Sequence, residues 1–426
     1  MSSAEWSNVC LIINALLWIT TFALYQYKTR YFGVGSGILL LYTAISIMAI
    51  HTYSSDDYSY LFGPIKFFPF LYLLLMILLA CYPILSMNES DIKYIQAPSK
   101  RLFNVVCWLV IIGALGGFPE AMSKIKDNLL MLVIDDTYGE NLYHETLNES
   151  TLKTSSSMNI VSIMSGICCN ISPILLAFYT TQSQKKRVIL IGLCLATLLL
   201  PVSQLASGSR NSIAICIINV FFLFIFIRNI IPVKLRRQLI KWGCLIAFIL
   251  MIPFVSLSIS RKGGNLGQTI ESMVLYGTEG VLLFNNYGLD PGGTRNGDYT
   301  AVAFKKIVGL NPAMYYTGRI TKYSHMKINE SQFYTFVGDF TLDYGPILAI
   351  LIFIATAVCF KRALIVRNKT ITLHQLMMFY LLMVGCLGYF QWPLGREGGN
   401  LQLIAILLLV IIFKIDHDLQ KHKIKI

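Results

Sequence analysis

The segment RKGGNLGQTI at residues 261–270 opens the longest polar stretch of the chain, which runs through GGTRNGD at 292–298 and closes on FVGDFTLDYG at 336–345. On both sides of it, apolar runs long enough to cross a bilayer as helices alternate with short basic turns. A connection of this length between two spanning helices more often carries function than linkage alone. The alternation predicts an all-α polytopic membrane protein with one large extramembrane segment.

The composition supports the same class of protein. Of 426 residues, 55% are hydrophobic and only 13% are charged, whereas soluble domains carry about a quarter charged residues. The net charge of +13 is distributed in clusters between the apolar runs, which indicates orientation in a lipid bilayer and argues against nucleic-acid binding. The ten cysteines lie in or beside apolar runs without metal-ligand spacing, so we predict small membrane hydrophobes and no metal site.

The apolar windows predict eleven membrane-spanning helices and no cleavable signal peptide. The windows lie at residues 9–25, 32–51, 67–86, 102–118, 158–179, 188–206, 211–227, 241–258, 345–360, 373–392 and 401–413. The organisation expected is spans one to eight in residues 1–260, a large periplasmic loop at 261–345, and spans nine to eleven with a cytoplasmic tail in 346–426.

The basic residues give the expected orientation. Of the 35 Lys and Arg residues, 21 lie in six short segments that share one side of the membrane if the N-terminus is outside. We therefore expect a periplasmic N-terminus, a cytoplasmic C-terminus and an outer loop at 119–157. Within that loop, residues 121–134 have helical apolar spacing, with Lys124 and Lys126 on the other face. This pattern fits an interfacial helix on the membrane or a surface helix packed on its own protein equally well.

Arginine-glycine turns are the first chemical signal. SGSRNS at 207–212 surrounds Arg210, RKGG begins with Arg261, and GREGG at 395–399 contains Arg396. The orientation places all three on the outer face, and Arg295 and Arg319 in the long loop are further candidates. Guanidinium groups bind phosphate in a bidentate way, and glycine allows close approach of the backbone. We expect an anion site here, with snorkelling arginines and ordinary salt bridges as the alternatives. There is no full dinucleotide or P-loop fingerprint.

Carboxylates are scarcer than arginines. Asp339 and Asp343 are four residues apart, so on a helix they share one face, and their like charges would raise one pKa. This would suit a general base for a sugar hydroxyl. The alternative is that Asp343 caps the next helix. Glu330 and His325 are competing candidates for the base.

Two further patterns accompany these carboxylates. Glu397 follows Arg396 directly, which makes the two a candidate pair. The loop is also rich in aromatic residues that would suit either a sugar-binding platform or an interfacial belt. They are Tyr315, Tyr316, Phe333, Tyr334, Phe336 and Phe340.

The order of the spans, the Gly-Ser-Arg turn in mid-chain and the outer loop that closes on Gly-Asp-(x)3-Asp-Tyr-Gly resemble the O-antigen polymerases. These Wzy-type enzymes are the oligosaccharide repeat-unit polymerases of bacterial envelopes, and the similarity in architecture covers nearly the whole chain. The resemblance implies a metal-independent glycosyltransferase of the GT-C type, without a cofactor, in the bacterial inner membrane. Such an enzyme joins repeat units carried on undecaprenyl pyrophosphate at the periplasmic face.

The resemblance also implies partners and site residues. The partners would be the lipid-linked donor and acceptor oligosaccharides, membrane lipid and a chain-length regulator protein, without nucleic acid. The arginines expected to engage the pyrophosphate are Arg210 and Arg261, followed by Arg319, Arg396 and Arg295. The base candidates stay Asp339, Glu330 and His325.

Two other functions remain open on the sequence. A flippase for the lipid-linked oligosaccharide would also be polytopic and basic, but transporters more often show internal repeats and broken helices, and no clear repeat is visible here. An O-antigen ligase would use the same donor.

Overall fold

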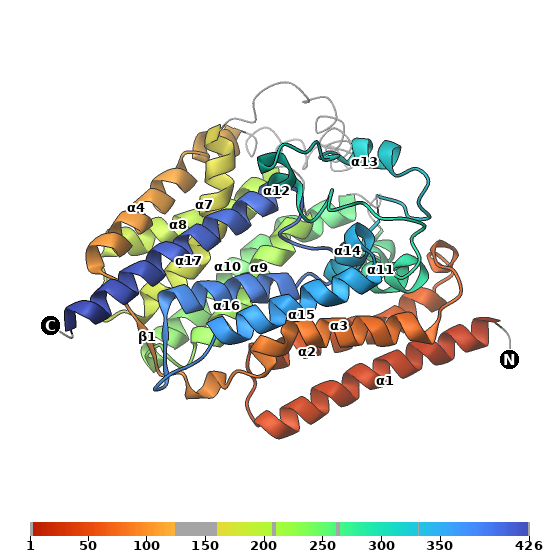
Figure 1. Cartoon of the computed structure of the whole chain (residues 1–426), viewed down its shortest axis with the longest axis horizontal. Coiled ribbons are helices and arrows are strands. Elements are labelled where there is room, and N and C mark those ends of the chain that lie inside the picture. Colours follow the sequence, from red (N-terminus) through yellow and green to blue (C-terminus); the bar gives the residue numbers. More distant parts are fainter. Residues whose placement is uncertain (1–2, 124–159, 207–209, 261–264, 331, 425–426) are drawn as a thin grey trace. The chain divides into compact units, whose positions relative to one another are not determined.

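The computed structural model describes residues 3–123, 160–206, 210–260, 265–330 and 332–424, and this part of the chain is predominantly helical (Figure 1). The helices up to the long polar segment are α1 (Ser3–Thr29), α2 (Val34–Ser54), α3 (Phe67–Leu85), α4 (Lys100–Leu115), α7 (Ile160–Thr181), α8 (Arg187–Ala206), α9 (Arg210–Ile227) and α10 (Val233–Ser260). Those after it are α15 (Pro346–Ala363), α16 (Leu373–Cys386) and α17 (Arg396–Ile424). Two short strands, β1 (Tyr94–Gln96) and β2 (Thr370–Thr372), pair in parallel.

Each of the eleven apolar windows overlaps one of these helices, but the window at 373–392 extends past the end of α16 at Cys386 into a loop. Eight helices in the described ranges are long and apolar enough to cross a membrane: α1, α2, α3, α4, α7, α10, α15 and α17. The apolar parts of α8, α9 and α16 are shorter, at 10–17 residues. The prediction of an all-helical polytopic membrane protein is confirmed at this level, and the number of eleven spans stays a prediction.

The long polar segment differs from the simple loop that the sequence led us to expect. It contains α11 (Leu266–Tyr287), α12 (Val302–Ile307), α13 (Tyr316–Lys322) and α14 (Thr335–Tyr344). Helix α11 has 22 residues, but Thr, Glu and Gly interrupt its apolar residues, so its average hydropathy stays low. Its last turns are nevertheless buried all round, at Val281, Leu282, Leu283 and Phe284. Tertiary packing therefore stabilises this segment as a helix.

The chain divides into two compact units, and unit 1 carries the polar segment. Unit 1 comprises Met1–Asn88, Ile270–Ile365 and Leu381–Leu403. Within it α1 packs on α2, and α3 runs beside α15 (Figure 1). Polar contacts fix α11 in this unit. The hydroxyls of Thr52 and Thr278 lie 2.8 Å apart, and Asn285 exchanges hydrogen bonds of 2.8 and 2.6 Å with the backbone of Lys66.

Unit 2 comprises Glu89–Thr269, Val366–Tyr380 and Ile404–Ile426. Helices α4, α7 and α8 pack against one another through small residues, which include Ala114, Cys169 and Ala196. Small side chains let helix backbones approach closely, as is common in membrane bundles. The hydroxyl of Ser165 donates to the carbonyl oxygen of Ala114 at 2.8 Å. The helix expected at 121–134 lies outside the described residues from position 124 onward.

Candidate active site

The turn at residues 292–298 positions the central side chain of the candidate site. Gly292 and Gly297 both have a φ angle of 80°, a conformation that is costly for residues with a side chain. The turn directs Arg295 into unit 1, where its side chain is 3% exposed. The glycines of this motif therefore serve to bury an arginine, an arrangement that sequence spacing alone does not reveal.

Arg295 forms ion pairs with three carboxylates at once. Its Nε donates to Asp343 Oδ1 at 2.7 Å, its Nη2 to Asp339 Oδ1 at 3.1 Å and its Nη1 to Glu330 Oε1 at 3.4 Å. Every guanidinium nitrogen thus has a carboxylate partner inside the protein. A buried charge is tolerated only with such pairing, because desolvation of an isolated ion is costly.

Asp343 connects α14 to the turn that carries Arg295. Its Oδ2 accepts hydrogen bonds from the backbone N–H of Thr300 at 2.7 Å, from the Thr300 hydroxyl at 2.7 Å and from the backbone N–H of Tyr299 at 3.3 Å. The alternative that Asp343 caps the next helix does not hold, because Gly345 is the N-cap of α15 and no side chain donates or accepts a capping bond there. The carboxylate serves instead to hold residues 295–300.

Asp339 lies on the same face of α14, as the four-residue spacing requires. Its Oδ2 accepts a hydrogen bond from the backbone N–H of Trp392 at 2.7 Å, so both of its oxygens are engaged. Burial raises the pKa of Asp339 to about 6, although Arg295 and the Trp392 N–H lower it in part. The like charge of Asp343 raises the pKa further, as a smaller contribution than burial.

A second buried arginine, Arg319, shares one of these carboxylates, that of Glu330. Nε of Arg319, on α13, donates to Glu330 Oε2 at 2.9 Å, and Nη1 donates to the carbonyl oxygen of Met314 at 3.1 Å. Glu330 therefore bridges Arg295 and Arg319, one through each oxygen. The side chains of both Arg319 and Glu330 are less than 5% exposed.

Tyr299 is the platform on which three of the predicted arginines converge. The guanidinium carbons of Arg295, Arg319 and Arg396 lie 5.1, 5.4 and 5.7 Å from the centroid of its ring. These distances are within the range of cation–π attraction. The Tyr299 hydroxyl donates to Gln391 Oε1 at 2.9 Å, and burial raises its pKa above the ordinary value, so the ring stays neutral.

Arg396 differs from the other two arginines because it is exposed and forms no ion pair with any described carboxylate. Its backbone N–H donates to the carbonyl oxygen of Tyr299 at 2.7 Å, which fixes the first residue of α17. The adjacent Glu397, expected as its partner, instead accepts a hydrogen bond from Lys306 at 2.6 Å. A cation held over an aromatic ring with an open side is suited to bind an anion.

A neighbouring cluster centres on Asp298, which is fully buried. Lys305, Lys322 and the hydroxyl of Tyr323 donate to its carboxylate, as does the backbone N–H of Ala313. Burial raises the pKa of Asp298, but the hydrogen bonds from Lys305 and Lys322 outweigh it and hold the pKa below its usual range. This cluster stiffens the connection between α12 and α13.

The structure brings together five of the eight predicted site residues: Arg295, Arg319, Arg396, Asp339 and Glu330. His325 is exposed and packs near Gly293 and the ring of Tyr323, whose centroid is 6.4 Å from its own. Arg210 begins α9, but its side chain lies outside the described part of the chain, as does the whole of Arg261. Their assignment to an anion site therefore stays a prediction from the sequence.

Two residues of this region, Tyr299 and Glu279, are not among the residues predicted from the sequence. Tyr299 follows the glycine turn without any motif of its own. Glu279 is a half-buried carboxylate on α11 whose pKa is raised to about 7, chiefly by burial, while the backbone N–H of Phe333 lowers it by hydrogen bonding. A carboxylate directly before the apolar run 281–284 was the available sign, since charges beside buried runs need a reason.

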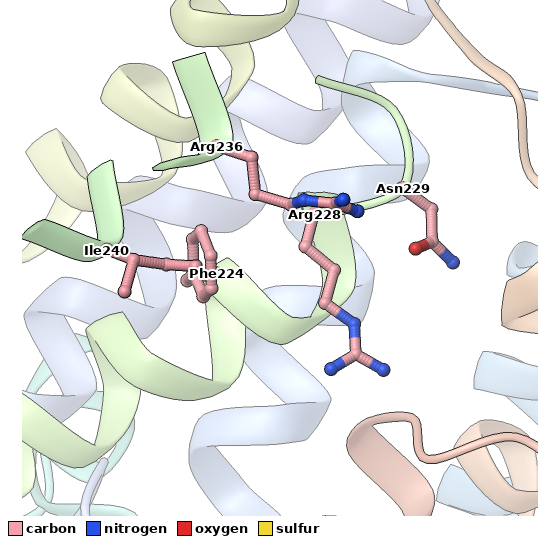
Figure 2. Close-up of a pocket in the computed structure, with 5 residues that line it drawn as sticks. All are labelled: Phe224, Arg228, Asn229, Arg236 and Ile240. Atoms are coloured by element: carbon pink, nitrogen blue, oxygen red, sulfur yellow. The ribbon is translucent and has the colours of Figure 1, made fainter. Parts of the chain in front are cut away.

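Unit 2 contains a hollow of a different character. The hollow has a volume of about 380 Å³ and lies at the turn between α9 and α10. Figure 2 shows the residues that line it: Phe224, Arg228, Asn229, Arg236 and Ile240. This turn belongs to one of the basic segments expected on the cytoplasmic side. Among the described residues, no group of three or more His, Cys, Asp and Glu side chains is placed to hold a metal ion.

Comparison of the chain with protein-family models, with curated proteins and with solved structures finds no match. The chemistry of the site therefore rests on its own geometry. That geometry combines two neutralised, buried arginines with a third cation that is exposed and oriented by the same ring.

Proposed function

We propose that this protein is a polysaccharide polymerase of the O-antigen type, a metal-independent glycosyltransferase. It joins oligosaccharide repeat units carried on undecaprenyl pyrophosphate. The observation that carries the proposal is the convergence of Arg295, Arg319 and Arg396 on the ring of Tyr299. It places the exposed guanidinium group of Arg396 at the edge of a rigid polar cluster. The same chain is rich in apolar helices that can accommodate a lipid carrier.

Arg396 is the group that we assign to the pyrophosphate. Its charge is permanent, its planar donors match phosphate oxygens, and no described carboxylate competes for it. Arg295 and Arg319 act indirectly, because their guanidinium groups are engaged with Asp339, Asp343 and Glu330. They fix Tyr299, and Tyr299 in turn orients Arg396. Arg210 and Arg261 remain candidates for the same phosphate-binding role on the basis of the sequence.

The reaction is a single displacement at the anomeric carbon of the donor. The acceptor sugar hydroxyl gives its proton to a base while its oxygen attacks the anomeric carbon. The bond between that carbon and the phosphate oxygen breaks, and undecaprenyl pyrophosphate leaves. The configuration at the anomeric carbon is thereby inverted. Negative charge develops on the leaving oxygen, and a cation held in place beforehand stabilises it most effectively. Asp339 and Glu330 each use both oxygens in hydrogen bonds, so the geometry favours a positioning role for them over that of the general base.

The setting of this reaction is the periplasmic face of the bacterial inner membrane, with the N-terminus outside and the C-terminus inside. The distribution of Lys and Arg supports this orientation. A chain-length regulator protein is a partner that this function would require for a defined product length. A fluorescent protein fused after residue 426 should fluoresce, since folding of such reporters succeeds in the cytoplasm. A fused reporter that is accessible only from the outside of the membrane would overturn the predicted orientation.

The direct test uses purified protein in lipid nanodiscs together with a polyprenyl-pyrophosphate-linked repeat unit. We expect a ladder of products that differ by one repeat unit, visible on a gel. Absence of any elongation by the wild-type protein, with the donor intact and the protein folded, would overturn the proposal.

A deletion strain separates the related functions. Loss of a polymerase leaves single repeat units on the lipid core, loss of a ligase leaves the core bare, and loss of a flippase strands the units inside the cell. Only the first pattern agrees with the proposal.

A further inference from the structure

Helix α11 is held in one rotational position around residue 279. On one side, the hydroxyl of Thr278 contacts that of Thr52 at 2.8 Å. On the other, Gly280 lies so close to the neighbouring backbone that a Cβ there would meet Thr335 N at 3.1 Å and Tyr389 O at 3.1 Å. Because the residues before and after it are both fixed, the direction of the Glu279 side chain is fixed as well.

The surroundings of Glu279 are aromatic. The backbone N–H of Phe333 donates to its carboxylate. The ring of Phe333 lies 5.7 Å from that of Tyr276, one turn earlier on α11, and 5.2 Å from that of Phe390. Tyr276, Glu279 and Phe333 are all partly exposed, so a ligand can reach them. Aromatic faces beside a carboxylate form the usual lining of a carbohydrate site, since the apolar faces of sugars stack on such rings.

Glu279 is also the carboxylate of this region that forms no ion pair with any described residue. Asp339, Asp343 and Glu330 are all neutralised by Arg295 or Arg319. Burial raises the pKa of Glu279 to about 7. A group with this pKa exchanges protons readily near neutral pH.

One short loop, between α16 and α17, borders both Glu279 and the arginine cluster. The carbonyl oxygen of Phe390 accepts a hydrogen bond from Thr335 N at 3.0 Å, next to Gly280. The following residue, Gln391, accepts from the Tyr299 hydroxyl at 2.9 Å, and Arg396 ends the loop over the Tyr299 ring. Glu279 and the rings of Tyr276 and Phe333 therefore lie at one end of the loop, and the exposed guanidinium group of Arg396 lies at the other.

We propose that Glu279 is the general base of the glycosyl transfer, and that Tyr276 and Phe333 bind the acceptor sugar beside it. The inference rests on the proposed polymerase function. Glu279 accepts the proton of the acceptor hydroxyl while that oxygen forms its bond to the anomeric carbon of the donor. The donor's bond to the pyrophosphate oxygen breaks, its electron pair leaves with the polyprenyl pyrophosphate, and the proton passes from Glu279 to water after product release.

The test compares elongation rates of purified variants in nanodiscs with the lipid-linked repeat unit as substrate. Glu279→Gln keeps the size of the side chain and removes the base, so we expect elongation to fall by about 100-fold or more. Glu279→Asp should keep an intermediate rate. Formate, a small carboxylate that can occupy the space left by Glu279→Ala, should restore part of the activity of that variant. The control is Glu271→Gln on the same helix, whose carboxyl is hydrogen-bonded to Asp57, and it should elongate at close to the wild-type rate.

A purely structural role makes different predictions. Binding of the lipid-linked donor and the melting temperature should be unchanged in Glu279→Gln if Glu279 is the base. A variant that loses donor binding or folding would overturn the proposal, as would wild-type elongation by Glu279→Gln. The latter result leaves the polymerase function intact, whereas failure of the wild-type protein to elongate overturns both.

Discussion

The guanidinium carbon of Arg396 lies 5.7 Å from the centroid of the Tyr299 ring, and the backbone N–H of Arg396 donates to the carbonyl oxygen of Tyr299 at 2.7 Å. The start of α17 and the turn after Asp298 are thus joined twice, once through the backbone and once through side chains. Because Tyr299 also contacts the two buried arginines, the direction of the exposed cation depends on the state of the whole ion-pair cluster.

Arg396→Ala should lower elongation without unfolding the protein. Loss of a charge-assisted contact costs about 1.5–3 kcal/mol, which corresponds to roughly 10- to 100-fold in rate. The lost cation–π contact should lower the free energy of unfolding by only about 0.5–1 kcal/mol. Elongation assays and thermal melting in nanodiscs measure the two effects. Lys306→Ala is the control, since it removes an exposed cation paired with Glu397, and it should leave elongation nearly unchanged. Equal effects of the two substitutions would contradict the assignment.

Arg295→Met should act mainly on stability. It leaves Asp339, Asp343 and Glu330 without their shared cation inside the protein. Removing one partner of a buried ion pair typically costs about 3–5 kcal/mol. Lys327→Met is the comparison, because Lys327 pairs with Asp290 on the surface, where such pairs contribute about 0–1 kcal/mol. Denaturant unfolding monitored by fluorescence measures both. A stable Arg295→Met variant that has lost only pyrophosphate binding would instead give Arg295 a direct role with the ligand.

The ring and the hydroxyl of Tyr299 should make separate contributions to the stability and activity of the protein. Tyr299→Phe removes only the hydrogen bond to Gln391 and should cost about 1 kcal/mol of unfolding free energy. Tyr299→Leu removes the platform for three guanidinium groups and should cost about 1.5–3 kcal/mol of unfolding free energy, at about 0.5–1 kcal/mol for each contact. Elongation should fall in Tyr299→Leu and persist in Tyr299→Phe. If both variants elongate equally well, the ring does not orient Arg396.

The pH dependence of stability should carry a signature of Asp339. Burial raises its pKa from 3.8 to about 6, with Arg295, Asp343 and the Trp392 N–H as the groups that face it. Since the folded state holds this proton more tightly than the unfolded chain, the stabilising contribution is complete below about pH 4 and is lost as the pH rises through about 6.

Asp339→Asn lacks this titration. The stability difference between wild type and Asp339→Asn should therefore decrease from pH 4 to pH 7, as measured by melting temperatures in buffers of constant ionic strength. A difference that grows over the same interval would contradict the raised pKa.

The positions of the helices at 9–25 or 67–86 could be predicted because a bilayer imposes both length and composition on any segment that crosses it. Helix α11 could not be predicted in the same way. Its alternation of Thr, Glu and Gly with apolar residues has meaning only in the tertiary structure, where Gly280 meets the backbone of Thr335 and Tyr389. The sequence of α11 therefore predicts a polar loop and not a helix.

In the candidate site, too, some residues could be predicted from the sequence and others could not. Guanidinium chemistry identified five arginines as candidates, and the structure places three of them, Arg295, Arg319 and Arg396, around one ring. Their partners were not predictable, because the pairing of Arg295 with Asp343 joins residues far apart in the chain. Local adjacency misled in one case, since Glu397 pairs with Lys306 and not with Arg396. Tyr299 has no signature in the sequence, because its role consists entirely of what packs against it.

The amide of Asn400 and the carboxylate of Asp343 hold residues 299–303 from two later helices. Asn400 accepts from Ala303 N at 3.0 Å and donates to the carbonyl oxygen of Thr300 at 2.9 Å, while Asp343 binds the N–H groups of Tyr299 and Thr300. Between these anchored residues and α13, the chain passes through Gly309, which has a φ angle of 78° and open space around it. We therefore expect the two parts to recognise each other without a covalent connection at Gly309. Polypeptides 1–309 and 310–426, synthesised separately in one cell, should find each other and complement into a working protein.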